Sequence, residues 1–439
     1  MSTDEIPDDE REEQITRLLN AYEKRLREKY PRRLPQSIEE IERSAEEIGE
    51  GVKQDIQQEE TGSAGTGYDG KKAMCRCGKL SRFKEERSRS IVTLHGVLIM
   101  KRAYYWCKAC RSGSYPLDKR LPVPRGQISV SVRALACRFT SLLPYAKAAR
   151  ELELVCGIRL SVSTMERISR QVGQDINRAW KARQDAVWED RYEPSCRPPE
   201  RMHISMDGVM AHVGGVWREV KLGVCYQPGK DGPTRDTYCA TLDPSHEFGK
   251  RVKTLSVHAG ETLCRNVAVL ADGGEWIWQE AAKHYTTRTQ ILDFFHVTEH
   301  LWEVARSRFG PSSEAAADWV SLQKARLIER EHGAGEVIRD VSEWAPNSES
   351  GRDIRRRTVR YLLKHEHRMR YHAFREQGHQ IASGVMESSC RWVVQQRMKG
   401  SGMRWQTTGA EAMLALRTAL CSEADGDILA AARSTTLRA

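Results

Sequence analysis

The sequence predicts a multidomain α/β protein, with a small cysteine-rich β unit and a helical segment in front of the α/β domain. Strand-like and helix-like segments alternate after residue 200, which is typical of an α/β domain. Two cysteine pairs flank strand-like text near the N-terminus, which predicts the β unit. The length of 439 residues, roughly three domains at about 150 residues each, argues against one compact core.

Charge is distributed unevenly along the chain. Residues 1–60 hold 18 acidic and 10 basic residues, a net charge of −8, so the remainder carries +18 of the overall +10. A cationic body behind an acidic arm favours a polyanionic partner. Nucleic acid is favoured over a lipid surface, because no basic amphipathic helix with an aromatic face is present.

The composition predicts a cytoplasmic protein, associated with the nucleoid if its partner is DNA. Hydrophobic residues make up 39% of the chain, and no run approaches the roughly 20 apolar residues of a membrane span. No apolar signal segment follows Met1. A chain of this size does not need disulfides, so the twelve cysteines indicate a reducing compartment. Most of them, such as Cys137, Cys225 and Cys239, lie in apolar patterns typical of buried free thiols.

Shifts in composition and periodicity divide the chain into segments. Residues 61–73 are rich in Gly, Ser and Thr and are predicted to be a linker. The other predicted segments are a charged helical arm (1–60), a zinc-ribbon-like unit (74–118), a helical DNA-binding domain (119–193), an α/β domain (194–421) with a mostly helical stretch at about 301–380, and a tail (422–439).

The α/β domain is predicted to begin with three antiparallel strands. Period-two alternation covers Met202–Asp207, Val216–Tyr226 and Thr237–Leu242, with a Gly214-Gly215 turn between the first two. A helix, a buried strand, a second helix and a further strand are predicted to follow, at Ser245–His258, Val267–Asp272, the segment around Trp276 and Trp278, and Gln290–His296.

The first four cysteines form a ligand-like cluster. Cys75-x-Cys77 and Cys107-x-x-Cys110 are separated by 29 residues of strand-like text. Four thiolates from two such knuckles satisfy a tetrahedral Zn²⁺, which predicts a zinc ribbon. The first pair is one residue tighter than the usual spacing, so either one ligand is missing or His95 replaces it. The alternative is four reduced cysteines without metal, although so short a segment has little core of its own.

Two helices in the helical segment are spaced as in a helix-turn-helix. The first ends at Gly157 and the second opens near Ser161, where Ser163 and Glu166 match a capping box. One face of the second helix is apolar, with Met165, Ile168 and Val172. Its outward residues are predicted to contact DNA, as a recognition helix does in a major groove: Arg167, Arg170 and Gln171. Any two packed helices share this pattern, so the assignment also depends on the charge and the cysteine cluster.

Three carboxylates lie where a metal site is expected. Asp207 ends one predicted strand before Gly208, and Asp272 ends another before two glycines. Glu387 follows Ser383, a predicted helix cap, on a helix whose predicted buried stripe is Val385, Met386, Trp392 and Val393. Carboxylates on separate elements suit two Mg²⁺ or Mn²⁺ ions for phosphoryl transfer. By spacing alone the three acids are weak evidence, because most acids are solvated surface charges.

Several motifs together resemble bacterial insertion-sequence DDE transposases of the Kra type, which are similar to the Mutator-like transposases. The resemblance covers roughly residues 74–421. It is carried by the text before Cys107-Lys-Ala-Cys110, Met206-Asp207-Gly208, Ala271-Asp272-Gly-Gly-Glu-Trp-Ile-Trp278, Asp293-Phe-Phe-His296, Ser383-Gly-Val-Met-Glu387 and Ser401-Gly-Met-Arg-Trp405.

The resemblance implies an RNase H-like catalytic domain interrupted by a helical insertion, with Asp207, Asp272 and Glu387 as the catalytic acids. The Asp-x-x-His element of those transposases falls on Asp293 and His296. His296 then orients the scissile phosphate or a metal-bound water, whereas the residues alone favour a hydrogen-bonded core histidine. The tight Cys75-x-Cys77 pair departs from the family pattern.

The expected function is therefore that of a transposase. Such an enzyme recognises element-end DNA, cleaves it by metal-assisted hydrolysis, and joins the 3′-hydroxyl to target DNA, acting as a homo-oligomer in the DNA complex. Two alternatives remain open at this point. One is a nuclease of the same chemistry that only cuts, and the other is a non-catalytic DNA-binding regulator in which the carboxylates are structural.

Overall fold

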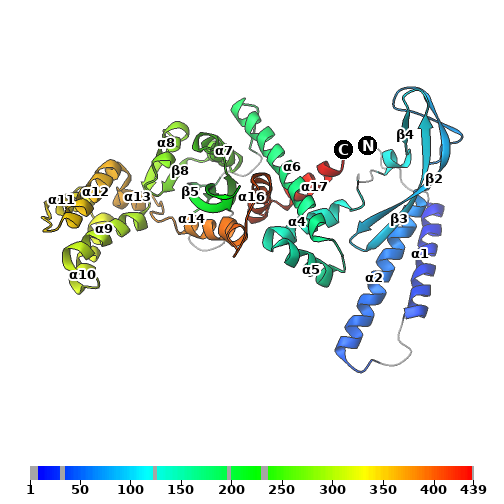
Figure 1. Cartoon of the computed structure of the whole chain (residues 1–439), viewed down its shortest axis with the longest axis horizontal. Helices are drawn as coiled ribbons and strands as arrows, with labels where there is room; N and C mark the ends of the chain where they lie inside the picture. The colour runs from blue at the N-terminus through cyan, green and yellow to red at the C-terminus, as the bar shows by residue number, and fades with distance from the viewer. Residues whose placement is uncertain (1–7, 30–34, 122–125, 195–198, 229–235, 438–439) are drawn as a thin grey trace. The chain divides into compact units, whose positions relative to one another are not determined.

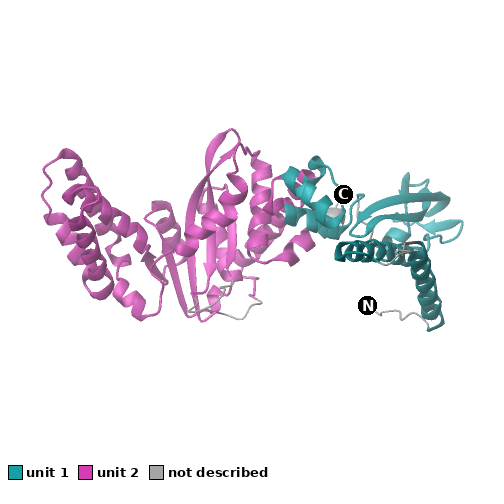
Figure 2. Ribbon diagram, turned by 90° about the horizontal axis from the view of Figure 1, so that it is seen from below, with its two compact units in different colours: residues 1–139, 145–165, 432–439 teal, residues 140–144, 166–431 magenta. Residues whose placement is uncertain are grey.

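The structure is a computed structural model that describes residues 8–29, 35–121, 126–194, 199–228 and 236–437. It is a mixed α/β chain with two sheets, and Figure 1 labels many of its elements on a ribbon coloured by residue number. The chain divides into two compact units (Figure 2), unit 1 with residues 1–139, 145–165 and 432–439, and unit 2 with residues 140–144 and 166–431. Within the described ranges, none of the helices has the length and apolar character that a bilayer crossing requires.

Unit 1 begins with a helical hairpin, which agrees with the predicted helical arm. Helix α1 (Asp8–Lys29) lies antiparallel to α2 (Ile38–Ser63), and Figure 1 shows the two side by side. The Ser37 side chain caps α2 by accepting from the Glu40 N–H. Arg25 and Asp55 form a half-buried ion pair of 2.8 Å between the helices.

A four-stranded antiparallel sheet follows, with strand order β1-β2-β3-β4. A small cluster of buried apolar residues, Ile91, Met100 and Leu117, packs on it, and Ala103 and Tyr105 of β3 are also buried. The strands and the short helix after them are β1 (Lys72–Met74), β2 (Leu80–Thr93), β3 (Gly96–Cys107), β4 (Ser112–Ser114) and α3 (Leu117–Arg120). With so few buried apolar residues, this sheet needs support beyond its own core.

The predicted linker at residues 61–73 is wrong. Its first three residues continue α2, and its last two belong to β1. The Tyr105 hydroxyl donates to the Gly70 carbonyl and accepts from the Asp69 N–H, both at 2.8 Å. Gly67 lies so close to Leu117 that a Cβ would be 2.6 Å from the Leu117 backbone nitrogen. Gly67 therefore permits a close backbone approach at this point.

The segment predicted as a helical domain, residues 119–193, is mostly helical, and its residues are divided between the two units. Its helices are α4 (Val130–Leu142), α5 (Tyr145–Cys156) and α6 (Val162–Trp188). The boundary between the two units falls inside α4 and again inside α6. The predicted Ser163–Glu166 capping box is also wrong. The Ser161 hydroxyl accepts from the Thr164 N–H at 3.2 Å, so the helix begins two residues earlier.

Unit 2 contains a five-stranded sheet of order β7-β6-β5-β8-β9. Strands β5, β6 and β7 are antiparallel neighbours, which confirms the prediction, and β8 and β9 run parallel to β5. The elements are β5 (Arg201–Val213), β6 (Val216–Tyr226), β7 (Thr237–Thr241), α7 (Ser245–His258), the 3₁₀ turn η1 (Glu261–Leu263), β8 (Asn266–Ala271), α8 (Glu275–His284) and β9 (Thr289–Leu292). The predicted helix Ser245–His258 is confirmed, and Cys225 and Cys239 are buried as predicted.

The strand predicted at Gln290–His296 is half wrong. Strand β9 ends at Leu292, and helix α9 begins at Phe294 because the Asp293 side chain caps it. A helical stretch then extends through residue 376, which agrees with the predicted helical insertion except that it starts earlier. Its elements are α9 (Phe294–Phe309), α10 (Glu314–Glu329), α11 (Gly333–Glu343), α12 (Glu349–His365), η2 (Glu366–Arg368) and α13 (Tyr371–Glu376).

The chain returns to the sheet in an irregular helix. Helix α14 (Gly384–Ser389) continues through a π-helical segment, η3 (Cys390–Gln395), into α15 (Gln396–Met398), and helices α16 (Thr407–Cys421) and α17 (Asp425–Leu437) follow. The prediction that Trp392 is buried is wrong, since it is 50% exposed, while Cys390 and Val394 are buried. The wider π turn changes which side chains face the core.

Candidate active site

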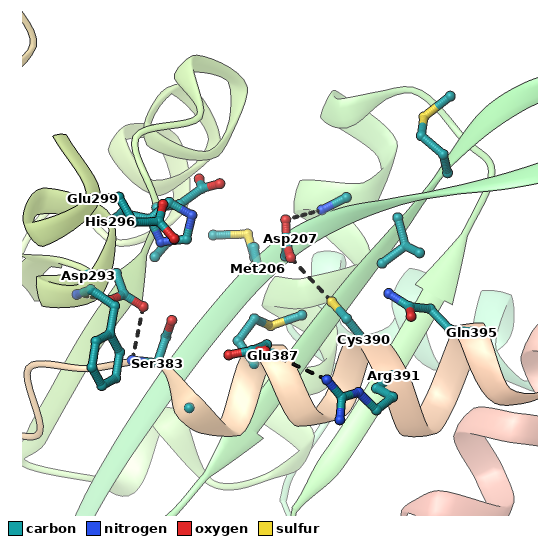
Figure 3. A pocket seen from close by; sticks show the side chains of 18 of the residues that line it. Met206, Asp207, Asp293, His296, Glu299, Ser383, Glu387, Cys390, Arg391 and Gln395 are labelled. Atoms are coloured by element: carbon teal, nitrogen blue, oxygen red, sulfur yellow. Dashed lines mark hydrogen bonds and ion pairs between the residues drawn. The ribbon is translucent and has the colours of Figure 1, made fainter. Parts of the chain in front are cut away.

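Unit 2 has a cavity of about 530 Å³ above the carboxyl ends of the parallel strands. The predicted acids Asp207, Asp272 and Glu387 all line it, together with His296. Figure 3 shows the side chains of most lining residues, several of them from α14 and the following π-helical segment. Three further polar groups that line the cavity were not assigned to the site from the residues alone: Asp293, Glu299 and Cys390.

Three aspartates form one row across neighbouring parallel strands. Strands β5 and β8 are paired up to Ile204 and Val269, and Asp207 and Asp272 each follow three residues later. Strands β8 and β9 are paired up to Ala271 and Leu292, so Asp272 and Asp293 are the next residues on each. Strand register therefore brings these acids to one edge of the sheet.

Asp207 is half-buried, and both of its carboxylate oxygens have partners. Its Oδ1 accepts from the Gly208 N–H at 2.6 Å, and its Oδ2 lies 3.2 Å from the Cys390 Sγ. Burial raises the pKa of Asp207, and the negative charge of Asp272 raises it further. Burial and the neighbouring carboxylate also raise the pKa of Cys390, so the thiol is a neutral donor to Asp207.

The turn after Asp272 is held by backbone and aromatic contacts. The Asp272 Oδ1 accepts from the Gly274 N–H at 2.8 Å, and its carbonyl accepts from the Trp278 indole at 2.7 Å. Gly273 packs on the ring of Tyr361 from α12, where a Cβ would be 2.2 Å from a ring carbon. The helical insertion therefore contacts the turn that positions Asp272.

Asp293 connects two elements of the site. Its Oδ1 accepts from the Phe295 N–H at 2.6 Å, which caps α9, and its Oδ2 accepts from the Ser383 N–H at 3.0 Å. Burial raises the pKa of Asp293. Ser383 stands at the N-cap of α14 as predicted, but its side chain makes no cap hydrogen bond. Asp293 therefore fixes the start of the helix that carries Glu387.

Glu387 and His296 lie on the open side of the cavity. The Glu387 side chain is 82% exposed and lies 3.9 Å from Arg391, one turn further along the helix. His296 is exposed on the first turn of α9, so the alternative of a core histidine is wrong. Glu275 does not line the cavity, and its exposed carboxylate is 3.7 Å from Lys364.

The three predicted acids are not preassembled into a tight cage. In the part of the chain that the structure describes, the only group of three or more His, Cys, Asp or Glu ligands whose donor atoms lie within 4.8 Å of one another is the cysteine cluster. The donors around the cavity are nevertheless carboxylate oxygens, which hard divalent cations prefer. The repulsion between Asp207 and Asp272 is what a bound cation would neutralise.

All four predicted cysteines meet in unit 1. The Sγ atoms of Cys75 and Cys110 are 3.6 Å apart, and those of Cys77 and Cys107 are 3.7 Å apart. A tetrahedron with Zn–S bonds of about 2.3 Å has sulfur–sulfur edges of about 3.8 Å. The cluster can therefore hold a metal ion, and the tight spacing of the first pair does not prevent it. His95 does not belong to the cluster, because it lies beside Glu50.

Two of the three residues predicted to contact DNA are exposed on α6, as expected. Met165, Ile168 and Val172 are fully buried, while Arg167 and Arg170 are exposed. Arg170 lies 4.0 Å from Glu166, a weak surface pair that leaves its guanidinium accessible. Gln171 is half-buried. Its position is therefore less suited to reaching a base than those of the two arginines.

Comparison with known proteins gives two matches. Residues 74–194, from the β unit through α6, match the model of a family described as "Uncharacterised protein family (UPF0236)". A protein of Streptococcus gallolyticus described as "UPF0236 protein in vanSb 3′region" is 24% identical over 350 residues, which is 76% of this chain and 72% of that protein. The two matches agree on the family name.

The raised pKa of Asp207 predicts that an uncharged residue at this position stabilises the fold. When the folded state raises the pKa of a carboxyl, the protein loses stability as pH rises from the unfolded-state pKa of about 3.9 through the raised folded-state pKa. Asp207→Asn should therefore raise the midpoint of urea unfolding at pH 7, without added divalent metal, and the gain should shrink towards pH 4. Asp318→Asn, at an exposed position, is the matched control. An Asp207→Asn variant less stable than wild type at pH 7 contradicts this account.

Proposed function

We propose that this protein is a DNA transposase of the DDE type, with an RNase H-like catalytic domain in unit 2. One observation carries the proposal. Asp207, Asp272 and Glu387, chosen from separate sequence motifs, line one cavity although they lie 65 and 115 residues apart in the chain. The mixed sheet and the helical stretch between β9 and α14 support the proposed fold.

The proposed chemistry is metal-dependent cleavage and joining of phosphodiester bonds. Two Mg²⁺ or Mn²⁺ ions, when bound, would stabilise the attacking and leaving oxygens. Asp207 and Asp272 would hold them from the sheet, and Glu387 would complete the ligand set from α14. His296, exposed at the cavity wall, would orient the scissile phosphate. Asp293 would act as a positioning residue, because its carboxylate is engaged by backbone N–H groups.

Charge around the site suits a DNA substrate. Arg391 and Lys399 line the same cavity as the acids, and the chain outside residues 1–60 carries +18. Cations beside a carboxylate site attract a phosphate backbone and position it for cleavage. We propose element ends and target DNA as the partners, in the cytoplasm at the nucleoid.

The acids should be required for cleavage and not for binding. We expect Asp207→Ala, Asp272→Ala and Glu387→Ala each to abolish Mg²⁺-dependent cutting of supercoiled and element-end DNA, because each removes a proposed metal ligand. The measurements are a gel cleavage assay and a binding titration on the same DNA, where affinity should change little. Glu275→Ala is the matched control, since Glu275 is close in sequence but outside the cavity.

The same assay separates the alternatives. Cutting without joining of the 3′-hydroxyl would identify a nuclease, and binding without cutting in Mg²⁺ or Mn²⁺ would identify a non-catalytic regulator. If one acid variant cut at the wild-type rate, the assignment of that residue would be wrong.

We propose that the cysteine cluster holds a structural Zn²⁺, making the β unit a zinc ribbon. Elemental analysis of protein purified without chelator should give about one zinc per chain. The Cys107→Ser variant should not retain the metal, and its four-stranded sheet should unfold, because the apolar core of that sheet consists of only a few residues. Cys156→Ser, a half-buried cysteine outside the cluster, should retain it. Wild-type protein that is zinc-free yet protected from proteolysis between residues 72 and 114 would rule out the ribbon.

We propose that α6 reads DNA through Arg167 and Arg170. A contact with a base edge discriminates sequences by about 1–3 kcal/mol, whereas a phosphate contact weakens binding to all sequences alike. We expect Arg167→Ala and Arg170→Ala to reduce affinity for the element's own end more than for random DNA, measured by titration at several salt concentrations. Lys181→Ala, exposed further along the same helix, is the control. Equal losses on both DNAs would make this helix a phosphate clamp, and no loss would refute the assignment.

A further inference from the structure

The helical hairpin of unit 1 leaves a row of large apolar side chains in solvent. Three are on α1, where Ile15, Leu19 and Tyr22 are 43%, 60% and 43% exposed. Three more are on α2, where Ile38, Ile41 and Ile56 are 71%, 52% and 40% exposed. An ordinary protein surface exposes large apolar residues singly, whereas here six are exposed on one pair of helices.

These residues form a continuous face on each helix. At 100° per residue, Ile15, Leu19 and Tyr22 lie within about 60° of one another on α1. On α2, Ile38, Ile41 and Ile56 also fall within about 60°, and the half-buried Ile48 and Val52 lie between Ile41 and Ile56 in sequence, on the same side. We call the six exposed residues together the arm face.

The arm face is separate from the contacts that hold the hairpin in unit 1. Arg25 and Asp55 join α1 to α2, and Arg17 pairs with Glu59. The Gln58 side chain exchanges hydrogen bonds with the backbone of Ile99 on β3. On the helical wheel of α2, the sheet contact at Gln58 and the arm face lie on opposite sides of the contact with α1. Neither contact covers the apolar residues.

The charge along α1 identifies what would cover this face. Residues 8–14 contain five acids and one arginine, whereas residues 23–29 contain four cations and two acids. A second α1 laid antiparallel places each acidic end beside a basic end, while a parallel arrangement places like charges together. A surface that is complementary to itself under a two-fold axis is an isologous interface.

We propose that the arm face is a dimer interface, in which the α1–α2 hairpins of two copies of this chain pack as an antiparallel four-helix bundle. The apolar side chains of the two arm faces are buried against each other near Leu19. Helix pairs of this length gain most of their stability from such packing, because an isolated hairpin buries too little apolar surface. The proposal does not depend on catalysis, on DNA or on the metal at the candidate active site.

The first test is the mass of the full chain in solution, with zinc present and DNA absent. Sedimentation velocity should give twice the chain mass of 50.0 kDa. Leu19→Glu should raise the dimer dissociation constant by roughly 100-fold, because it buries a charge at the centre of the interface. Leu154→Glu is the matched control, at a leucine 67% exposed on α5. Unchanged circular dichroism would show that the variants are folded.

Wild-type protein that stays monomeric up to its solubility limit would overturn the proposal. So would a Leu19→Glu variant that is folded and still dimeric, because the dimer would then use another surface.

The second test examines the antiparallel direction at low ionic strength. Glu12 lies seven residues before Leu19 and Arg27 lies eight residues after it, so an antiparallel pair centred near Leu19 brings the turn that holds Glu12 in one copy beside the turn that holds Arg27 in the other. Glu12→Lys and Arg27→Glu should each weaken the dimer about tenfold, and the double variant should restore it. In a parallel pair the single variants would change little. That result, or a failure of the double variant to recover, would overturn the antiparallel arrangement.

Discussion

The pairing of β8 with both of its parallel neighbours is the constraint on which the site depends. Because β8 is paired in register with both β5 and β9, three carboxylates meet where these pairings end, and the charges of Asp207 and Asp272 repel each other there. The chain offsets this cost locally. Backbone N–H groups of Gly208, Gly274 and Phe295 each donate to one of the three acids. The sheet therefore keeps an anionic row that only a cation would fully neutralise.

Much of this arrangement could be predicted, because the residues that form it belong to short sequence patterns. Asp207 and Asp272 stood out as acids before glycines at the ends of predicted strands, and both line one cavity. Strand β8 does end just before Asp272, but the predicted end at Asp207 is wrong, because β5 continues to Val213. The three antiparallel strands and the helix Ser245–His258 followed from periodicity and are confirmed. The four cysteines were grouped by spacing, and their sulfur atoms meet. Their chemistry as ligands remains a prediction.

The failures have physical causes that a periodic pattern does not contain. Asp293 was read inside a strand because β9 is only four residues long and the helix cap follows at once. Trp392 was placed in the core by a 3.6-residue period, which the π-helical segment interrupts. The glycine-rich segment at residues 61–73 was interpreted as a linker, yet Gly67 packs against Leu117 so closely that any side chain at position 67 would clash. In each case a tertiary contact overrides the local signal.

The contact between Gly273 and Tyr361 has a consequence for how such sequences diverge. The ring from α12 occupies the space that any side chain at position 273 would need. Position 273 is then not free to change alone, since a larger residue there requires a smaller one at 361. Among relatives, the two positions should vary together even though 88 residues separate them. The helical stretch between β9 and α14 would therefore evolve together with the turn after Asp272. Exchanging this stretch between distant relatives would disturb that turn.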